Sequence, residues 1–168
     1  MSGNLAWHFL SESRSLTRHA IDAPVVSVVA GETYEVTGTL RPCSNGMHYS
    51  RRVLDALKYA PGPIICRVEI SPEYVEEGDK GCARWRRVLW LADATRSLHE
   101  FAVWCAEGVL NTERAAGREP DPRSWEAIAV KRRWLAEKAT DNELDAAWSA
   151  AWSAARSAAR SAARSAAP

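Results

Sequence analysis

Residues 64–70 read IICRVEI, and this stretch decides the fold. Apolar side chains nearly fill both faces of the segment when it is extended, which is typical of a strand in the middle of a sheet. The sequence therefore predicts an α+β fold with a small, mostly antiparallel sheet around these residues. The other expected strands are 5–9 (LAWHF), 25–29 (VVSVV), 32–40 (ETYEVTGTL) and 82–91 (CARWRRVLWL). Residues 82–91 could also form a helix, but their β-branched and aromatic content favours a strand.

A short helix is expected between two turns ahead of the central strand. Asn45-Gly46 is a turn dipeptide, and residues 47–50 are expected to be extended. Ser50 has the side chain of a helix N-cap. We therefore expect a helix over residues 51–59, which Pro61-Gly62 ends because the residue before a proline avoids the helical region.

From residue 93 onward the sequence predicts helices. Their start signals are a capping-box spacing at Ser97–Glu100, a cap followed by proline at Asp121-Pro122, and a second capping box at Thr140–Glu143. Apolar residues at helical spacing give the first two helices a predicted buried face each. These faces comprise Leu98, Phe101, Ala102, Cys105 and Val109 in the first helix, and Trp125, Ile128, Ala129, Leu135 and Ala136 in the second.

The chain ends in a four-residue repeat, Ala-Ala-Trp-Ser twice and then Ala-Ala-Arg-Ser, over residues 146–167. Each repeat advances about 400° around an α-helix and so drifts by about 40°. Alanine and arginine are good helix formers, so we expect a helix. Three interpretations stay open: tryptophans that pack on the preceding helices, an interaction helix with an arginine ladder for an acidic partner or nucleic acid, and replication slippage without function. The candidate binding residues are Trp148, Trp152, Arg156, Arg160 and Arg164, and the small alanine face makes a homo-oligomer a hypothesis to test.

Length and composition suit one domain with an appendage, since a domain takes roughly 100–200 residues. We expect an α+β domain at 1–110, a helical extension at 111–145 and the repeat helix at 146–168. Alanine accounts for 29 of the 168 residues, and many of these alanines lie in the repeat, so the apolar content of 46% overstates the core. The composition excludes a wholly disordered, collagen-like or disulfide-scaffold protein.

The net charge of +1 hides an asymmetry between the two ends of the chain. Residues 1–110 carry 12 basic and 13 acidic side chains, whereas residues 111–168 carry 10 and 8. This balance argues against a dedicated DNA-binding protein, although the basic tail suits an acidic partner or phosphate. The acidic residues 72–80 are interpreted as a solvated turn. Arg84 and Arg86 form a candidate basic stripe for nucleic acid on the following strand.

The four cysteines are spaced without a CxxC pair, so neither a zinc site nor a thioredoxin-like redox motif is expected. Four reduced and mostly buried thiols fit an intracellular compartment. No apolar stretch is long enough to predict a membrane span, and the N-terminus lacks the pattern of a signal peptide. The chain also lacks the phosphate-binding loops GxxxxGK[ST] and GxGxxG.

Several of these motifs together resemble a family of small uncharacterised domains that phages and prophages encode. The shared features are C-x-x-G-x-H at 43–48, A-L-x-Y-A-P-G at 56–62, GDK at 78–80 and RVLW at 87–90. Such proteins often continue into Ala-rich repeats, as this chain does. The resemblance covers roughly residues 5–110. It implies a phage or prophage origin and a location in the bacterial host cytoplasm, but no activity.

The same region is distantly similar to ADP-ribosyltransferase folds. The matching segments are the strand with Trp7-His8, the strand Gly46–Ser50 and the helix end Ala56–Tyr59. The similarity implies NAD as the cofactor. It implies that His8 hydrogen-bonds the nicotinamide ribose and that Tyr49 or His48 stacks on the nicotinamide. The glutamate that such enzymes use late in the sheet to stabilise the transition state has no strand counterpart after residue 91.

The leading functional hypothesis is a phage accessory protein that is not an enzyme. No complete catalytic set appears, and no cofactor is expected on this hypothesis. Eight tryptophans exceed the needs of a core of this size, and tryptophan and arginine are enriched at interface hot spots. We therefore expect binding to a host or phage protein complex, with inhibition of a host defence such as CRISPR or of a regulatory complex. The alternatives are an ADP-ribosyltransferase-like enzyme and a virion or assembly component.

Overall fold

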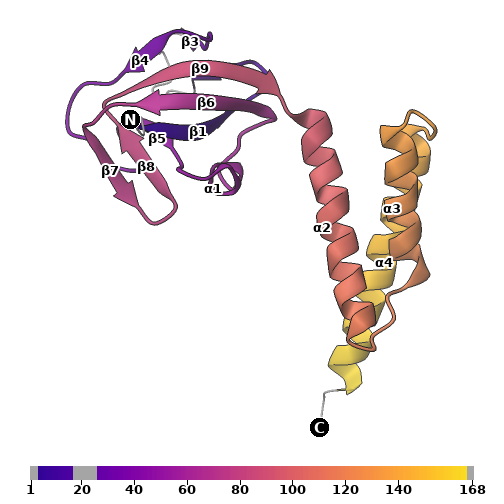
Figure 1. Ribbon diagram of the computed structural model, residues 1–168. Coiled ribbons are helices and arrows are strands. Elements are labelled where there is room, and N and C mark those ends of the chain that lie inside the picture. Colours follow the sequence, from indigo (N-terminus) through magenta and orange to yellow (C-terminus); the bar gives the residue numbers. More distant parts are fainter. Residues whose placement is uncertain (1–3, 17–25, 166–168) are drawn as a thin grey trace. The chain divides into compact units, whose positions relative to one another are not determined.

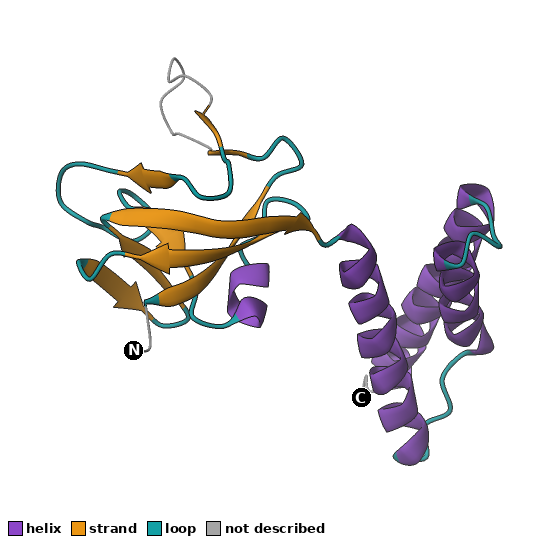
Figure 2. Ribbon diagram, turned by 45° about the horizontal axis from the view of Figure 1, so that its top comes forward, coloured by secondary structure: helices purple, strands orange, loops and turns teal. Residues whose placement is uncertain are grey.

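The computed structural model describes residues 4–16 and 26–165, with side chains up to residue 160. The chain divides into two compact units, Met1–Thr95 and Arg96–Pro168. The boundary between the units lies at residue 95, whereas the sequence predicted it at residue 110. The expected α+β class is confirmed: antiparallel sheets form the first unit and three long helices form the second (Figures 1 and 2).

A four-stranded antiparallel sheet is the frame of the first unit, and its strand order is β1-β6-β9-β4. The strands are β1 (Leu5–Leu10), β6 (Ile64–Ile70), β9 (Trp85–Asp93) and β4 (Thr33–Glu35). The prediction of a central strand is confirmed, because β6 lies between β1 and β9 (Figure 1). Burial along β6 alternates strictly, so only one of its faces is fully buried.

The buried face of this sheet forms the core of the first unit. Cross-strand partners share a face, so Ala6 of β1, Val68 of β6 and Val88 of β9 form a row across three strands. All three side chains are almost inaccessible to solvent. The remaining buried members of the core are Leu10, Val28, Tyr49, Ile64, Cys66, Ile70 and Ala83.

A three-stranded antiparallel sheet lies beside the first and has the order β5-β8-β7. Its strands are β5 (Met47–Tyr49), β8 (Lys80–Ala83) and β7 (Tyr74–Glu77). The prediction of a turn over residues 72–80 was therefore wrong. Only Gly78-Asp79 connects β7 to β8, and Gly78 has the positive φ of +63° that such a tight loop favours. The acidic side chains of β7 are compatible with a strand because all four of its residues are exposed at the edge of the sheet.

Other predicted strands are shorter or divided in the structure. The expected strand at 82–91 is split at Arg84 between β8 and β9. Only Thr33–Glu35 of the segment 32–40 is a strand, and Val26–Ser27 forms β3, which pairs with β2 (Ser15–Leu16). Val25, the first residue of the expected strand at 25–29, lies outside the described residues.

The helix α1 (Val53–Leu57) is shorter than predicted, and Ser50 does not cap it. Ser50 instead pairs with β1: its backbone N–H donates to the carbonyl of Trp7 at 3.0 Å, and the Trp7 N–H donates to the Ser50 carbonyl at 2.8 Å. This pair joins the end of β5 to the first sheet. Arg52 occupies the N-cap position of α1, but its side chain makes no capping hydrogen bond.

The second unit consists of α2 (Thr95–Ala115), α3 (Pro122–Leu135) and α4 (Asp141–Ser165). Two of the three predicted caps are confirmed. The Asp121 carboxylate accepts the Arg123 N–H at 2.9 Å. Glu143 accepts the Thr140 N–H at 2.7 Å, and Thr140 accepts the Glu143 N–H in return. The box at 97–100 was wrong, because α2 begins earlier, where Asp93 accepts the Thr95 N–H.

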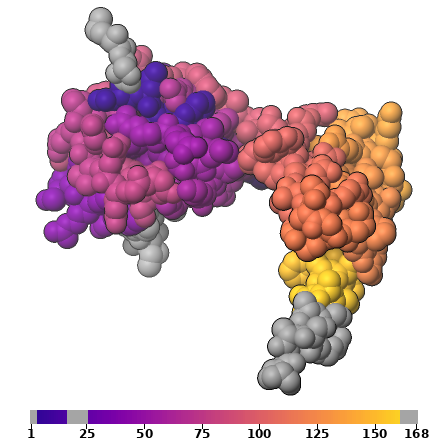
Figure 3. Space-filling model, turned by 60° about the horizontal axis from the view of Figure 1, so that its bottom comes forward, coloured from indigo at the N-terminus to yellow at the C-terminus, as the bar shows by residue number. Residues whose placement is uncertain are grey.

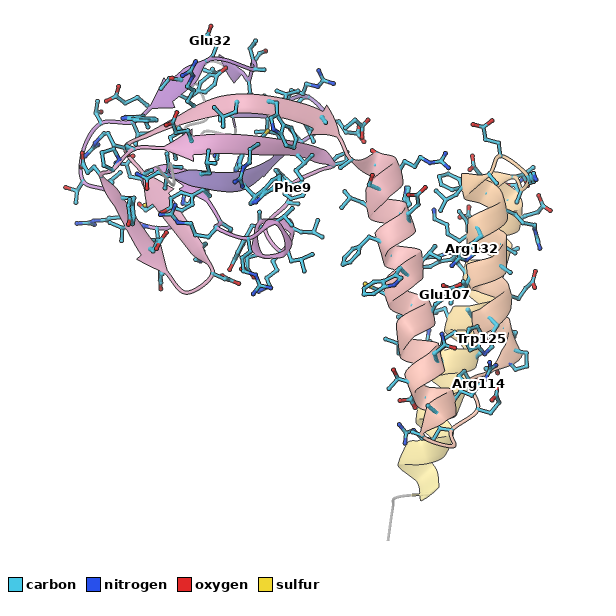
Figure 4. All side chains as sticks on the ribbon, viewed as in Figure 1. Phe9, Glu32, Glu107, Arg114, Trp125 and Arg132 are labelled. Atoms are coloured by element: carbon cyan, nitrogen blue, oxygen red, sulfur yellow. The ribbon has the colours of Figure 1, made fainter. Side chains whose placement is uncertain are left out.

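Polar and aromatic contacts hold α2 against α3. Arg132 of α3 donates from Nε to Oε1 of Glu107 at 2.9 Å, and the Arg114 guanidinium lies 4.5 Å from the Trp125 ring centroid. Figure 4 shows both pairs between the two helices. Most of the predicted buried stripe on α2 is exposed. Val103, which the pattern did not select, is the buried residue of α2.

The turn before β5 depends on Gly46. Its φ is +147°, and a Cβ built there would lie 2.5 Å from the Cβ of buried Cys82. We expect Gly46→Ala to lower the free energy of unfolding by about 1–3 kcal/mol, the usual cost of overpacking, in chemical denaturation. Gly31→Ala is the control, because Gly31 has a φ of +90° with no atom within 4 Å of the built Cβ. Equal losses in both variants would contradict the steric explanation.

Candidate functional site

A cavity of about 680 Å³ lies in the first unit. Its lining residues come from β1, β2, β4, β5, α1, β8, the start of β9 and the turn before β5. The three residues that the distant similarity implied as a site, His8, His48 and Tyr49, all line it. The lining also includes the polar or charged side chains of Cys43, Lys80 and Arg86. The structure therefore gathers side chains that are up to 79 positions apart (Arg86 minus Trp7) around one space.

His8 lies on the core-facing side of β1, opposite Cys66 of β6. It is half-buried, and its side chain makes no hydrogen bond within the described residues. Burial holds the pKa of His8 well below its ordinary value, and the nearby Arg86 and His48 lower it further. His8 is therefore a neutral imidazole at physiological pH, with one nitrogen able to donate and one able to accept.

Arg86 is the most unusual residue of the cavity. It follows the core-facing parity of Val88 on β9, and its side chain is 1% exposed. One guanidinium nitrogen, Nη1, donates to the His48 carbonyl at 2.5 Å, but Nε is buried without a hydrogen-bond partner. No carboxylate neutralises it in the described part of the chain. Burial lowers the pKa of Arg86 to about 10, so the group stays charged at neutral pH.

His48 and Tyr49 have structural partners in addition to the cavity. Nε2 of His48 accepts the Cys43 N–H at 2.9 Å, which holds the turn that precedes β5. The Tyr49 hydroxyl donates to Oε1 of Glu76 at 2.9 Å, and Arg51 donates from Nε to the same oxygen at 2.6 Å. Burial is the main reason that the pKa of Tyr49 is raised. Both side chains are thus oriented by the fold itself.

A second cationic group, Lys80, lies at the more exposed part of the cavity wall. Its Nζ donates to Sγ of Cys43 at 3.0 Å and lies 5.3 Å from the Tyr59 ring centroid. The hydrogen bond to Cys43 raises the pKa of Lys80. With Arg86, Lys80 gives the cavity two permanent positive charges. The acidic side chain among the lining residues of the described chain is the exposed Glu35.

Arg84 and Arg86 do not form an exposed basic stripe. Arg84 donates from Nη2 to Glu73 at 2.6 Å and from Nη1 to the carbonyls of Val36 and Gly38. Arg86 is buried in the cavity wall. The alternation of residues along β9 was the signal that could have placed Arg86 inside, because it shares its parity with Val88.

The repeat forms the predicted helix as part of α4. Trp148 is 61% exposed and Trp152 is 68% exposed, and Arg156 and Arg160 are exposed after them. Arg164 belongs to α4, but its side chain lies outside the described residues. The C-terminal part of α4, yellow in Figure 3, is at the surface. The alanine side of α4 faces inward instead: Ala154 is 2% exposed, and Cα atoms of α3 and α4 approach within 8 Å.

An aromatic pair on α2 was not predicted from the sequence. The rings of Phe101 and Trp104 stack with centroids 6.0 Å apart, and Trp104 is 69% exposed. Phe101 was expected in the core. The helical spacing of Phe101, Trp104 and Val109 marks one stripe, but spacing alone does not tell which stripe of a helix meets its neighbours.

The four cysteines are free thiols, of which Cys66 and Cys82 are buried, whereas Cys43 and Cys105 are exposed. The described residues contain no group of three His, Cys, Asp or Glu side chains that could hold a metal ion. Within the same part of the chain, no helix has the length and apolarity needed to cross a membrane.

Comparison with known proteins gives one match. Residues 27–100 match a family described as a domain of unknown function (DUF7666). The expectation of an uncharacterised domain is confirmed at this level, while the phage origin stays a prediction. No curated protein and no solved structure shows significant similarity to the chain. The matched segment includes His48, Tyr49 and Arg86 of the cavity but neither His8 nor the repeat helix.

The depressed pKa of His8 makes a testable contribution to stability. The unfolded chain takes up a proton on His8 near its ordinary pKa of about 6.5, whereas the folded chain does so only at lower pH. The free energy of unfolding therefore falls as the pH drops below about 6.5, by at most about 1.4 kcal/mol per pH unit from this group. Urea denaturation at several pH values should show a shallower loss in His8→Gln than in the wild type. Identical pH profiles would contradict this account.

Proposed function

We propose that the protein acts by binding another protein through an exposed face of α4, which we call the Trp–Arg face: Trp148, Trp152, Arg156 and Arg160. The observation that carries the proposal is the exposure of two tryptophans one helical turn apart, at 61% and 68%. Each aromatic side chain of this kind buries about 150–250 Å² when it is covered. Two neighbouring tryptophans left open to water supply the apolar centre that a binding surface needs.

The order of residues along α4 gives the face its polarity. Successive members of the Trp–Arg face lie about 6 Å apart along the axis, and each is rotated by about 40° from the last. The tryptophans come first and the arginines follow, with no acidic residue after Asp145. This arrangement suits a partner with an apolar pocket beside acidic side chains. Arginine favours such contacts because its planar guanidinium pairs with carboxylates in a fixed geometry.

The small core of the helical unit also supports a binding role. Among the described side chains from residue 96 onward, the buried apolar residues are Val103, Ile128, Val130 and Ala154. The larger aromatic residues Trp104, Trp148 and Trp152 are mostly exposed. These three tryptophans add little to the stability of the isolated helical unit, because burial is what makes apolar area favourable.

The kind of partner follows from the resemblance to phage-encoded domains. We propose a host or phage protein complex, with a defence or regulatory complex of the bacterial host as the target that would be inhibited. A nucleic acid is the less favoured partner, because the face offers few arginines and begins with tryptophans. Nucleic-acid affinity that rests on a few phosphate contacts falls steeply with salt, whereas an aromatic interface does not.

Replacing the two tryptophans tests the proposal. A Trp148→Ala/Trp152→Ala variant should lose a partner that wild-type protein recovers from bacterial lysate, as measured by quantitative mass spectrometry. With that partner purified, calorimetry should show binding weakened about 30-fold or more, since a hot-spot tryptophan typically contributes about 2 kcal/mol or more.

Trp104→Ala is the matched control, because Trp104 is equally exposed on another helix of the same unit. It should retain the partner. Equal binding of the purified partner by the wild type and the double variant would overturn the proposal. So would light scattering that shows a wild-type dimer and a monomeric double variant, because the face would then join two copies of this chain.

The competing proposal is an ADP-ribosyltransferase-like enzyme that uses NAD. It is supported by the position of His8, His48 and Tyr49 around one cavity. The hydrogen bonds of His48 to Cys43 and of Tyr49 to Glu76 give two of these residues structural roles that need no substrate. Incubation with labelled NAD and lysate separates the proposals. The enzyme proposal expects label transfer or NAD loss that His8→Ala abolishes, and the binding proposal expects neither.

A further inference from the structure

The buried guanidinium of Arg86 needs an explanation that the Trp–Arg face does not give. Burying a charge is costly unless the charge is paired, and Arg86 is 1% exposed with no carboxylate partner in the described chain. Its hydrogen bond to the His48 carbonyl occupies Nη1, while Nε is left without a partner. A neutral donor would satisfy one carbonyl at a lower cost. The guanidinium therefore has unused capacity that points to an absent acceptor.

The surroundings of Arg86 favour an anion as that acceptor. Arg86 and His48 both lie close enough to His8 to lower its pKa. Lys80 adds a second positive charge to the same wall. Glu35, the acidic residue of the lining, is exposed on β4 and forms no ion pair with Arg86. The neutral imidazole ring of His8 has no protein hydrogen bond in the described chain, so its ring N–H is available to an oxygen acceptor.

The size and lining of the cavity restrict the ligand further. A volume of about 680 Å³ is far larger than one phosphate or carboxylate group and falls within the usual range of small-molecule sites, about 300–1,000 Å³. Apolar and aromatic side chains, among them Leu16, Met47 and Tyr49, complete the walls. Such a lining suits an organic body attached to the anionic group.

We propose that this cavity binds a small organic anion, whose phosphate or carboxylate group pairs with Arg86 and accepts a hydrogen bond from His8. Arginine suits this role because its fork of N–H groups matches the paired oxygens of either group. The site lies in the first unit and involves none of the residues of the Trp–Arg face. Anion binding and partner binding are therefore measured separately, and one proposal can fail while the other holds.

Titration of the full-length protein with simple anions tests the site. Sodium phosphate and sodium succinate are compared with sodium chloride at matched ionic strength, and binding is followed by the rise in melting temperature that a ligand of the folded state causes. We expect phosphate or succinate to stabilise the wild type beyond chloride, and the stronger of the two identifies the chemical group. An equal effect of all three salts would reduce the result to charge screening and overturn the proposal.

Arg86→Met removes the guanidinium while it keeps a flexible apolar side chain in a buried position. We expect its affinity for the effective anion to fall about tenfold or more, as for the loss of a charge-assisted hydrogen bond. Arg87→Met is the matched control, because Arg87 is the next residue of β9 and is exposed on the opposite face. It should bind as the wild type does. Unchanged affinity in Arg86→Met would overturn the proposal.

A measurement on the wild type keeps the test decisive if Arg86→Met does not fold. The ring signals of His8 are assigned in NMR spectra by their absence from His8→Gln. Addition of the effective anion should shift these signals along a saturable curve. The ring signals of His99, which lies on α2 in the helical unit, should stay unchanged. Saturating anion without any shift of the His8 signals would overturn the proposal.

Discussion

The antiparallel pairing of β6 with β1 and β9 is the interaction on which the first unit depends. Through it, residues near position 8 lie opposite residues near position 66, and these in turn lie opposite residues near position 91. Because strand pairs share a face, one register places a whole row of side chains in the core. A shift of that register by one residue would turn His8 and Arg86 to the outer face and open the core to water. The same hydrogen-bond ladder thus determines both stability and the composition of the cavity.

Local signals in the sequence predicted the central elements well. The caps at Asp121 and Thr140–Glu143 depend on interactions between near neighbours, and the apolar run at 64–70 shows its burial in its own composition; the structure confirms all three. Predictions failed where a distant segment competes for the same group. Ser50 has a capping side chain, but its backbone pairs with Trp7, which lies 43 positions away (50 minus 7). The strand β7 was missed for a different reason: its acidic composition suggested a turn, but only Gly78-Asp79 turns, and β8 directly afterwards provides the hydrogen-bond partners of β7.

The candidate sites show the same division. Period-two alternation would have placed Arg86 inside, yet neither alternation nor composition reveals that no carboxylate meets it there. That fact depends on which side chains seven separate elements bring to the cavity. On α2, the apolar stripe predicted from the spacing is mostly exposed, and Val103 is buried instead. Spacing within one helix does not show which of its faces the neighbouring helices cover.

The inward alanines of α4 have a consequence for how this chain can vary. Ala154 marks the end of the buried contact with α3, and the residues from 155 to 160 are exposed. Each repeat is encoded by twelve nucleotides, so duplication or loss of one Ala-Ala-Arg-Ser unit keeps the reading frame. Such an event lengthens or shortens the arginine row by about 6 Å and rotates its end by about 40°, while the packing before residue 155 is untouched. The length of the arginine row can thus change in single genetic steps at almost no cost to folding.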